Sequence, residues 1–518
     1  NTFYIMLIKI SSIANVGLET VPVDVEVDVA TAGFPGFTIV GLASKAVEEA
    51  RERVKTAIIN SGFDFPPKKI TVNLAPADLP KDGAAYDLPI AVGVLIASGQ
   101  LVAPPELVSG KMFFYGELSL DGMLRPTRGI LLLALFANHK RGVTIFVPAP
   151  SVAEASVVSE VTVIPVVNLS DLFRHLSGTR TISPLIHTVY ENDEDEVYHD
   201  TDLKDIAGQE QAKRALIIAA AGGHNVLMWG PPGTGKTMLA RALPGILPPL
   251  SAAEALEVTR IYSISGMLSQ GTAIVKQRSF RSPHHGVSAA GLIGGGTNPQ
   301  PGEVSLAHLG VLFLDEMPEF PRSVLEGLRQ PMEDGVVEIV RVSGHVRYPA
   351  SFTLIAAINP CPCGYLGHPR RECKCTEKQI TKYRHRISGP ILDRIDLTVM
   401  VAPVEVEKLS VTKEFSDQSM PTKEAKKAVV RVRAIQSKRF AGTTLYTNSQ
   451  MRNRDIKKFC NLTPEAENFL KLAAEKYDFS ARSYMRLIKV SRTIADLSDE
   501  KTILPAHMAE ALQYKQLV

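Results

Sequence analysis

The chain has 518 residues, which is too long for one hydrophobic core and suits two or three domains. Its hydrophobic content of 45% and charged content of 21% are ordinary for a soluble globular protein. The net charge of +3 argues neither for nor against nucleic acid, so local charge has to decide. The longest apolar runs, 88–98 and 130–137, are too short to span a bilayer. No basic segment with a following apolar stretch opens the chain. We therefore expect a cytoplasmic protein with no membrane contact.

The first third of the chain alternates between strand and helix patterns. Residues 21–29 alternate apolar and polar side chains, which predicts a half-buried strand, and 45–61 have helical periodicity. Further strands are expected at 69–74, 111–120 and 143–147, with a helix over 127–139. The pattern predicts an α/β domain that has no phosphate-binding loop of its own. An acidic stretch follows at 190–205, with eight carboxylates and one lysine, and is typical of a solvated linker.

A phosphate-binding loop lies near the middle of the chain. It fits the pattern G-x-x-x-x-G-K-[ST] and consists of Gly230, Pro231, Pro232, Gly233, Thr234, Gly235, Lys236 and Thr237. A predicted strand at 225–229 precedes it and a predicted helix follows it, so a chance glycine-rich turn is the weaker interpretation. Backbone N–H groups of such a loop surround a phosphate, Lys236 can reach the β- and γ-phosphates of ATP, and Thr237 can hold Mg²⁺.

Two later apolar strands end in polar side chains. Residues 310–316 end in Asp315 and Glu316, and residues 352–359 end in Asn359. Next to a phosphate-binding loop, Asp315 is expected to bind Mg²⁺ through water and Glu316 to polarise the attacking water. Asn359 can orient that water from the other side. Alone, the two acids would be equally consistent with a solvated strand end.

Four of the five cysteines follow Asn359 closely: Cys361, Cys363, Cys373 and Cys375. Four thiols in fifteen residues can form a zinc site, although the C-x-C spacing is less usual than C-x-x-C. Reduced structural thiols or a redox pair are the alternatives. Cys460 stands alone and is expected to be a buried apolar residue.

The C-terminal region is basic and helical. Residues 421–460 contain eleven Lys or Arg and two acidic residues, and Val429, Val432 and Ile435 place the first part on an amphipathic helix. The basic face is expected either to bind phosphate backbone or to be a solvated helix face. Two more helices are expected at 465–477 and 483–497.

The order of these motifs resembles an AAA+ ATPase module. Residues 388–397 and 480–497 narrow the resemblance to the magnesium-chelatase-like branch and, within it, the bacterial ComM/YifB family, and the likeness runs from about Leu7 to the C-terminus. It implies an α/β protein with a Lon-protease-like N-terminal domain (7–178), an acidic linker (179–203), an AAA+ core (204–405) and a helical lid (406–518). Gly208 and Gln209 would then pack on the adenine.

The resemblance also assigns roles to arginines and to two insertions. Arg482 would contact the γ-phosphate in its own subunit, with Arg486 as second choice. Arg394 would reach the nucleotide of a neighbouring subunit, unless it forms a salt bridge within the chain. The glycine-rich insertion at 278–297, expected to be an exposed mobile loop, and a β-hairpin at 335–349 turning at Ser343 and Gly344 would line a central pore. The residues that could meet DNA phosphates there are Arg281, His284, Arg341, His345 and Arg347; ordinary surface positions or subunit contacts are the alternative.

The N-terminal region carries two stretches that resemble Lon proteases, 80–88 and 116–126. The position of the Lon serine is Ala85, and the lysine positions fall on Leu131 and Leu133. A methyl group cannot attack a carbonyl and leucine cannot activate a nucleophile. The fold is therefore expected without the protease chemistry, as a scaffold or as a collar that faces nucleic acid.

The resemblance implies a hexameric ring ATPase that uses ATP and Mg²⁺. Zn²⁺ at the cysteines stays one of the interpretations of their spacing. It would act as a helicase on single-stranded and branched DNA and promote branch migration in homologous recombination and natural transformation. The alternatives are the ATPase subunit of a metal-chelatase-like complex and an ATP-dependent protease. The absence of an integrin-like metal-binding domain opposes the first alternative, and Ala85 with Leu131 opposes the second.

Overall fold

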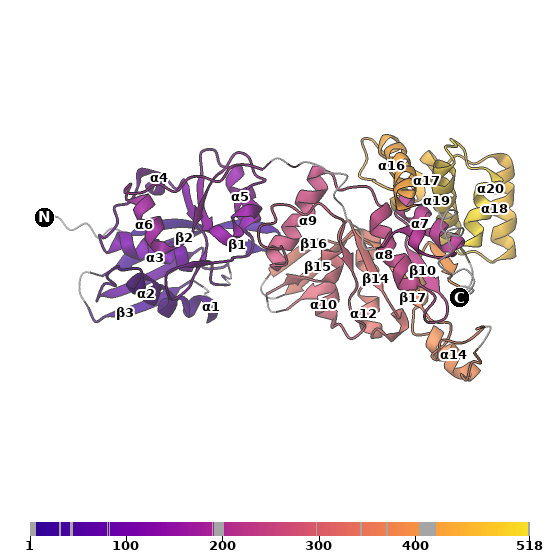
Figure 1. The fold of residues 1–518 in the computed structure, drawn as a ribbon, viewed down its shortest axis with the longest axis horizontal. Coiled ribbons are helices and arrows are strands. Elements are labelled where there is room, and N and C mark those ends of the chain that lie inside the picture. The colour runs from indigo at the N-terminus through magenta and orange to yellow at the C-terminus, as the bar shows by residue number, and fades with distance from the viewer. Residues whose placement is uncertain are drawn as a thin grey trace.

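A computed structural model describes residues 7–30, 33–41, 45–79, 81, 83–188, 190, 201–296, 298–341, 344–368, 371–403 and 421–515. An N-terminal α/β region, a central α/β region and a helical C-terminal region follow one another along the longest axis (Figure 1). Among the described residues, no helix is both long enough and apolar enough to cross a membrane.

The N-terminal region is built on a mixed seven-stranded sheet of order β3-β4-β2-β1-β5-β8-β9. The strands β1 and β2, and β2 and β4, pair antiparallel, whereas the other neighbours pair parallel. Every second residue of β2 from Val23 to Val27 is fully buried, as the alternating sequence predicts. The strands are β1 (Ile8–Val16), β2 (Glu19–Val29), β3 (Gly36–Val40), β4 (Lys69–Ala75), β5 (Met112–Phe114), β8 (Thr144–Pro148) and β9 (Thr162–Val166).

The described part of this region also contains six α-helices and a small hairpin. Three boundaries differ from those predicted from the sequence. The predicted helix 45–61 is two helices because Glu49 interrupts it, and the predicted strand 111–120 is two short strands. The helix predicted from residue 127 begins at Ile130, after Gly129. The elements are α1 (Lys45–Glu48), α2 (Ala50–Asn60), α3 (Asp87–Ala97), α4 (Pro105–Val108), α5 (Ile130–Asn138), α6 (Leu169–Leu176), β6 (Glu117–Leu118) and β7 (Leu124–Arg125).

The central region has a five-stranded parallel sheet of order β11-β14-β17-β10-β18. Its central strands are buried along their whole length because helices cover both faces, so their sequences are continuous apolar runs. The strands are β10 (Val226–Trp229), β11 (Phe280–Arg281), β14 (Val311–Leu314), β17 (Thr353–Ile358) and β18 (Leu397–Met400). The helices are α7 (Glu210–Gly222), α8 (Lys236–Ile246), α9 (Ala252–Ser265), α11 (Glu303–Leu306), α12 (Arg322–Glu326), α13 (Arg329–Asp334), α14 (Glu377–Arg384) and α15 (Gly389–Leu392).

Both insertions of the central region contain regular secondary structure. The glycine-rich segment forms β11, a short helix α10 (Ala289–Ile293) and the strand β12 (Gly294–Gly295), which pairs with β13 (Gln300–Pro301). Ala289, Ala290 and Gly291 of α10 are exposed and Leu292 is completely buried, so this part of the segment is largely exposed, as predicted, but is a helix and not a loop. The second insertion is the predicted hairpin, β15 (Val336–Arg341) and β16 (Gly344–Pro349), in which Arg341 pairs with Gly344. Ser343 of its predicted turn lies outside the described residues.

The C-terminal region is a helical layer that shares a hydrophobic core with the central sheet. Val429 and Val432 of α16 and Ile494 of α19 belong to the same buried cluster as Val226 and Leu397 of the sheet. Its helices are α16 (Thr422–Arg439), α17 (Asn453–Phe459), α18 (Pro464–Lys476), α19 (Ala481–Leu497) and α20 (Pro505–Gln513). The phosphate-binding loop begins at the end of β10. The shared core therefore connects the helical layer to the strand that carries this loop.

The N-terminal region packs on the central region through several contacts. The turn between β1 and β2 meets α9, where Arg260 Nη2 donates to the carbonyl of Leu18 at 2.9 Å. Ser263 Oγ of the same helix donates to the buried carboxylate of Glu154 at 2.5 Å. Gly17 of that turn lies against Val346 of β16, where an added Cβ would come within 2.3 Å of the valine side chain. The N-terminal region therefore contacts the middle of the β15–β16 hairpin.

Candidate nucleotide site and cysteine centre

The phosphate-binding loop follows β10 at the carboxyl edge of the central sheet. The conformation needs glycine at three positions: Gly233 and Gly235 have φ 78° and 89°, and a Cβ on Gly230 would come within 2.1 Å of the carbonyl oxygen of Val401. The Gly230 N–H donates to the carbonyl of Ile358 at 3.2 Å. The loop is therefore anchored to β17, the strand that ends in Asn359.

Lys236 points into this loop from the first turn of α8. Its Nζ donates to the carbonyls of Gly230 at 2.6 Å and Pro231 at 2.8 Å, and to Oδ1 of Asn359 at 3.2 Å. Burial lowers the pKa of Lys236 to about 8, although the charges of Asp315 and Glu316 act in the opposite direction. The ammonium group lacks a direct carboxylate partner among the described residues, so it is available to a polyphosphate.

The acidic pair lies beside the loop at the end of β14. Thr237 Oγ1 donates to Oδ2 of Asp315 at 3.0 Å, which brings together two oxygen ligands of the kind that Mg²⁺ prefers. Glu316 is exposed and has φ 49°, a left-handed conformation that is uncommon for a residue with a side chain and is concentrated at functional sites. These residues fit a Mg²⁺–nucleotide complex.

The two predicted γ-phosphate arginines have different surroundings. Arg482 is exposed at the second position of α19 and makes no hydrogen bond or ion pair within the described parts of the chain. Arg486 is fixed instead: its Nη1 donates to the carbonyl of Leu392 at 3.2 Å, and its Nη2 lies 3.5 Å from Asp393. Of the two, Arg482 is the one free to move to a nucleotide.

Arg394 is engaged within its own chain. Its Nη1 donates to the carbonyl of Pro390 at 2.7 Å, its Nη2 pairs with the carboxylate of Glu333, and its side chain is only 13% exposed. The intrachain salt bridge, the alternative to a trans-acting arginine, is thus present in this structure. Glu333 is 57% exposed, so to reach a neighbouring subunit Arg394 would have to leave one exposed carboxylate and the carbonyl of Pro390.

The structure places the five predicted DNA contacts on the two insertions, several of them beside acids. Arg281 forms a two-pronged pair with Glu303 at 2.6 and 2.7 Å, and His284 stacks on His285 with ring centroids 4.0 Å apart. The exposed His345 and Arg347 lie 3.9 and 4.0 Å from the single carboxylate of Glu338. The side chain of Arg341 lies outside the described residues.

Two arginines of the basic helix α16 serve the fold. Arg433 donates two hydrogen bonds to the carbonyl of Ala220 at 3.0 and 2.7 Å, and Arg439 pairs with Asp496. These two are therefore not available to a phosphate backbone. Lys427, Arg431 and Lys438 remain exposed on this helix, so the expectation of phosphate contacts is confined to such side chains.

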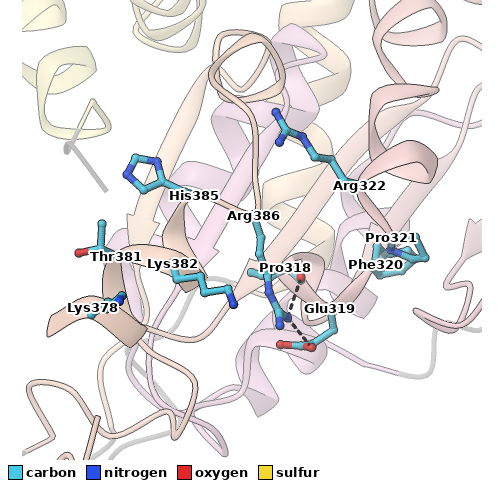
Figure 2. A pocket seen from close by; sticks show the side chains of 10 residues that line it. All are labelled: Pro318, Glu319, Phe320, Pro321, Arg322, Lys378, Thr381, Lys382, His385 and Arg386. Carbon is cyan, nitrogen blue, oxygen red and sulfur yellow. Dashed lines mark hydrogen bonds and ion pairs between the residues drawn. The ribbon is translucent and has the colours of Figure 1, made fainter. Parts of the chain in front are cut away.

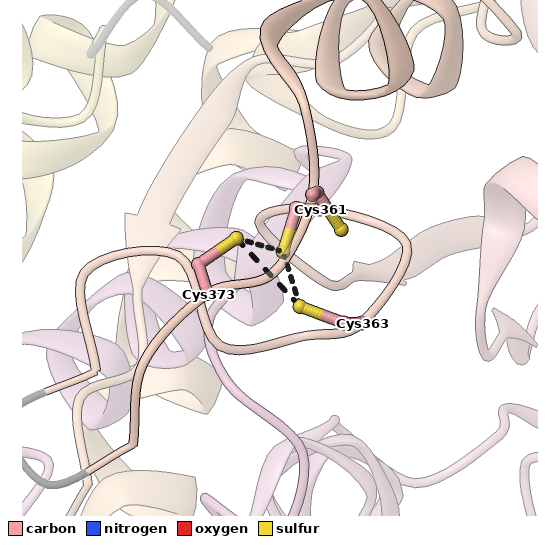
Figure 3. Close-up of side chains that lie close together, drawn as sticks. Cys361, Cys363 and Cys373 are labelled. Atoms are coloured by element: carbon pink, nitrogen blue, oxygen red, sulfur yellow. Dashed lines mark hydrogen bonds between the residues drawn. The ribbon is translucent and has the colours of Figure 1, made fainter.

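The four predicted cysteines meet in a loop directly after Asn359. The sulfur of Cys361 lies 3.4 Å from that of Cys363 and 3.6 Å from that of Cys373, and all four sulfurs lie within 4.8 Å of one another (Figure 3). Four sulfurs at 2.3 Å from a tetrahedral zinc ion are about 3.8 Å apart, so the cluster fits zinc. The backbone N–H of Tyr365 contributes most to lowering the pKa of the Cys363 thiol to about 6, which favours the thiolate.

The cysteine loop touches the phosphate-binding loop. A Cβ on Gly364 would come within 2.7 Å of Cδ of Pro232, so glycine is required for this approach. Helix α14 begins directly after Cys375 with a capping box between Thr376 and Gln379. A metal ion at the cysteines would therefore brace both the phosphate-binding loop and α14.

Sequence reasoning missed a buried connection between the sheet and α19. His224, immediately before β10, lies with Nε2 2.8 Å from Oγ1 of Thr493 and with Nδ1 3.3 Å from the carboxylate of Asp396. It thus links the helix that carries Arg482 to the segment after Arg394. A lone histidine gives no signal in the sequence, because the spacing to its partners exceeds 170 residues.

The three N-terminal positions that the resemblance to Lon proteases singled out lie in an apolar core. Ala85, Leu131 and Leu133 are buried in one hydrophobic cluster. Lys81, which is also buried, donates to the carbonyl of Pro76. The absence of protease chemistry stays a prediction from the sequence.

Comparison with known proteins agrees with the three-region architecture. Three family models match the chain. The family described as magnesium chelatase, subunit ChlI, matches residues 202–409. A family described as subunit ChlI of Mg-chelatase matches residues 25–151, and the family described as magnesium chelatase, subunit ChlI C-terminal, matches residues 419–515. The chain is 44% identical over 509 residues to competence protein ComM of Haemophilus influenzae, covering 98% of this chain and 96% of that protein. It is 42% identical over 513 residues to the uncharacterized protein YifB of Salmonella typhimurium, covering 97% and 96%. It is 30% identical over 194 residues to the magnesium-chelatase 67 kDa subunit of Heliobacterium mobile, covering 32% and 29%.

The geometry separates nucleotide binding from hydrolysis. Lys236→Ala removes the buried cation and should abolish ATP binding, whereas Glu316→Gln should bind ATP but hydrolyse it at least about 100-fold more slowly, because the general base is lost. Binding of a fluorescent ATP analogue and steady-state phosphate release check both. A Glu316→Gln protein with the wild-type rate would show that another residue activates the water.

The cysteine centre should contain one zinc ion per chain when the protein is purified without added metal. Elemental analysis measures the stoichiometry, and Cys373→Ser should lower it substantially. Cys460→Ser is the matched control, since Cys460 is buried beside Met451 and away from the cluster, and should leave the zinc content unchanged. Folded protein with no zinc and four titratable thiols would contradict the prediction.

Proposed function

The chain belongs to the ComM/YifB family of magnesium-chelatase ChlI-like proteins, and we propose that it is an ATP-driven hexameric DNA helicase that promotes branch migration during homologous recombination and natural transformation. The observation that carries the proposal is the meeting of Lys236, Thr237, Asp315 and Asn359 at one sheet edge, with hydrogen bonds of 3.0 to 3.2 Å between them. The near full-length similarity to a competence protein supports DNA as the substrate.

The chemistry follows from the positions of these side chains. Lys236 exchanges its bonds to the loop carbonyls for the β- and γ-phosphates. Thr237 and Asp315 hold Mg²⁺, which supplies positive charge to the phosphates. Glu316 takes the proton of the attacking water and Asn359 orients that water. Because Asn359 already accepts a hydrogen bond from Lys236, binding of the γ-phosphate to Lys236 frees the amide for the water.

Two arginines complete the charge balance in the transition state. Arg482 approaches the γ-phosphate from α19 of the same subunit. Arg394 leaves the exposed Glu333 and reaches the nucleotide of the neighbouring subunit, where a second cation is worth about 10³-fold or more in rate. Hydrolysis then requires an assembled ring, and ring closure depends on bound nucleotide.

The DNA path is proposed to run along the two insertions. The hairpin β15–β16 carries the exposed His345 and Arg347, and the N-terminal region contacts the middle of this hairpin through Gly17. We assign the N-terminal region the Lon-like fold without protease chemistry and the role of a collar next to the pore. Its contacts through Leu18 and Glu154 to α9 would move it together with the hairpin.

A metal-chelatase-like remodelling ATPase is the alternative, because the family descriptions are those of a magnesium chelatase subunit. The two functions share the nucleotide site and differ in the substrate that the ring moves. The chain's similarity to the Heliobacterium chelatase subunit covers 32% of its length, whereas its similarity to ComM covers 98%. This difference favours the DNA substrate.

The proposal predicts that DNA controls ATP hydrolysis. Single-stranded and forked DNA should raise the rate of phosphate release severalfold, and the protein should displace a labelled strand from forked DNA only with hydrolysable ATP. DNA binding should weaken steeply with salt, as phosphate contacts do. The Glu316→Gln protein is the control, and it should bind DNA without displacing the strand. A wild-type protein that hydrolyses ATP at the same rate with and without DNA, and binds neither form, would rule out the DNA motor.

A further inference from the structure

A second cationic feature lies outside the two insertions, next to the catalytic edge of the sheet. A cleft of about 940 Å³ separates α14 from residues 318–322, which follow Glu316 (Figure 2). The charged and titratable side chains that line it are Arg322, Lys378, Lys382, His385, Arg386 and Glu319. The cleft therefore carries four groups that are permanently cationic, one histidine and one acid.

Most of this positive charge is unpaired. Arg386 Nη1 pairs with Glu319 at 2.7 Å and donates to the carbonyl of Pro318 at 3.3 Å. Lys378, Lys382 and Arg322 are exposed and form no ion pair with any described residue. The insertion residues Arg281 and Arg347, by contrast, lie beside Glu303 and Glu338. The cleft therefore carries positive charge that an external anion can balance.

Both walls of the cleft carry cationic side chains. Lys378 and Lys382 are four residues apart on α14, so their side chains lie on one face about one helical turn apart. Tyr383 is buried under the same helix and fixes that face outward. Arg322 stands on the opposite wall at the first residue of α12. A chain of phosphates can be held between walls of this kind, whereas a single small anion would contact only one of them.

The lining offers phosphate contacts and little for bases. Phe320, the phenyl ring of the lining, is 3% exposed, so it has no free face on which a base could stack. Lysine and arginine head groups bind phosphates without reading sequence. The ligand class is thus a polynucleotide backbone, bound independently of its sequence.

We propose that this cleft, between α14 and residues 318–322, is a second DNA-binding site that holds the phosphate backbone of a single strand outside the pore insertions. The inference rests on the proposed DNA motor and adds to it the place where a strand is sensed. It does not require the insertion residues to bind DNA.

The position of the cleft connects this strand to ATP hydrolysis. One wall begins two residues after Glu316. The other wall is formed by α14, whose buried Tyr383 lies beside the backbone of Asn359. A strand clamped between the walls would press on the segments that carry Glu316 and Asn359. Such contact would stimulate hydrolysis when DNA is bound and leave the rate without DNA unchanged.

The test is charge reversal of the two helix lysines, Lys378→Glu with Lys382→Glu, in the full chain. Binding of fluorescent oligo(dT) is measured by anisotropy with a non-hydrolysable ATP analogue at several salt concentrations, together with ATP hydrolysis with and without DNA. We expect the affinity to fall by about tenfold or more and the salt slope to fall by about 1.4, which is about 0.7 for each lysine on a single strand. Stimulation of hydrolysis by DNA should be lost, while hydrolysis without DNA stays at the wild-type rate.

The control is Lys471→Glu with Lys476→Glu on α18, which makes the same change in charge on exposed lysines of another helix. Equal DNA affinity and equal salt slope in the cleft variant and the wild type would overturn the proposal and leave the DNA motor intact. An equal loss of DNA affinity in the control variant would show that the effect comes from the change in net charge, and it would also overturn the proposal. If the cleft variant loses nucleotide-dependent assembly in mass photometry while its DNA affinity is unchanged, the cleft binds a neighbouring subunit instead. Failure of the wild type itself to bind oligo(dT) would reject both this site and the proposed function.

Discussion

The parallel pairing of β14, β17 and β10 is the constraint on which the candidate site depends. Trp229 lies opposite Ile358, and Leu314 lies opposite Ala356, so the three strands end at the same edge of the sheet. The residues that follow them are consequently neighbours although about 130 positions separate the first from the last. Parallel strands that are buried on both faces leave their carboxyl ends as the place where polar side chains can gather.

Several connections run outward from this edge and give the nucleotide a means to change the rest of the molecule. Gly364 of the cysteine loop packs on Pro232 of the phosphate-binding loop, and His224 joins the base of β10 to α19. In the other direction, α9 contacts the N-terminal region through Arg260. The cysteine loop therefore packs directly on the phosphate-binding loop, and the helical layer and the N-terminal region are joined to the central region by packed contacts.

Motifs confined to one segment were predictable from the sequence, and contacts between distant segments were not. The loop that ends in Lys236, the strand that ends in Glu316 and the four cysteines each depend on local spacing, which the sequence displays directly. The engagement of Arg433 and of Arg281 depends on where a carbonyl or a carboxylate from another element lies, so composition alone made both look available to DNA. The break at Glu49 in the first predicted helix was likewise not predictable, because no glycine or proline lies at that position.

The central claim is that a nucleotide site built at this edge is completed by Arg394 of a neighbouring subunit, and subunit mixing tests it most directly. Arg394→Ala should bind ATP and lose hydrolysis, and so should Glu316→Gln. Glu333→Gln, which removes the intrachain carboxylate partner of Arg394, should keep hydrolysis. Mixing the two inactive proteins should restore part of the phosphate release, because one interface then combines an intact Glu316 with an intact Arg394. Full activity of Arg394→Ala alone, or no recovery in mixed rings whose composition has been verified, would contradict the account.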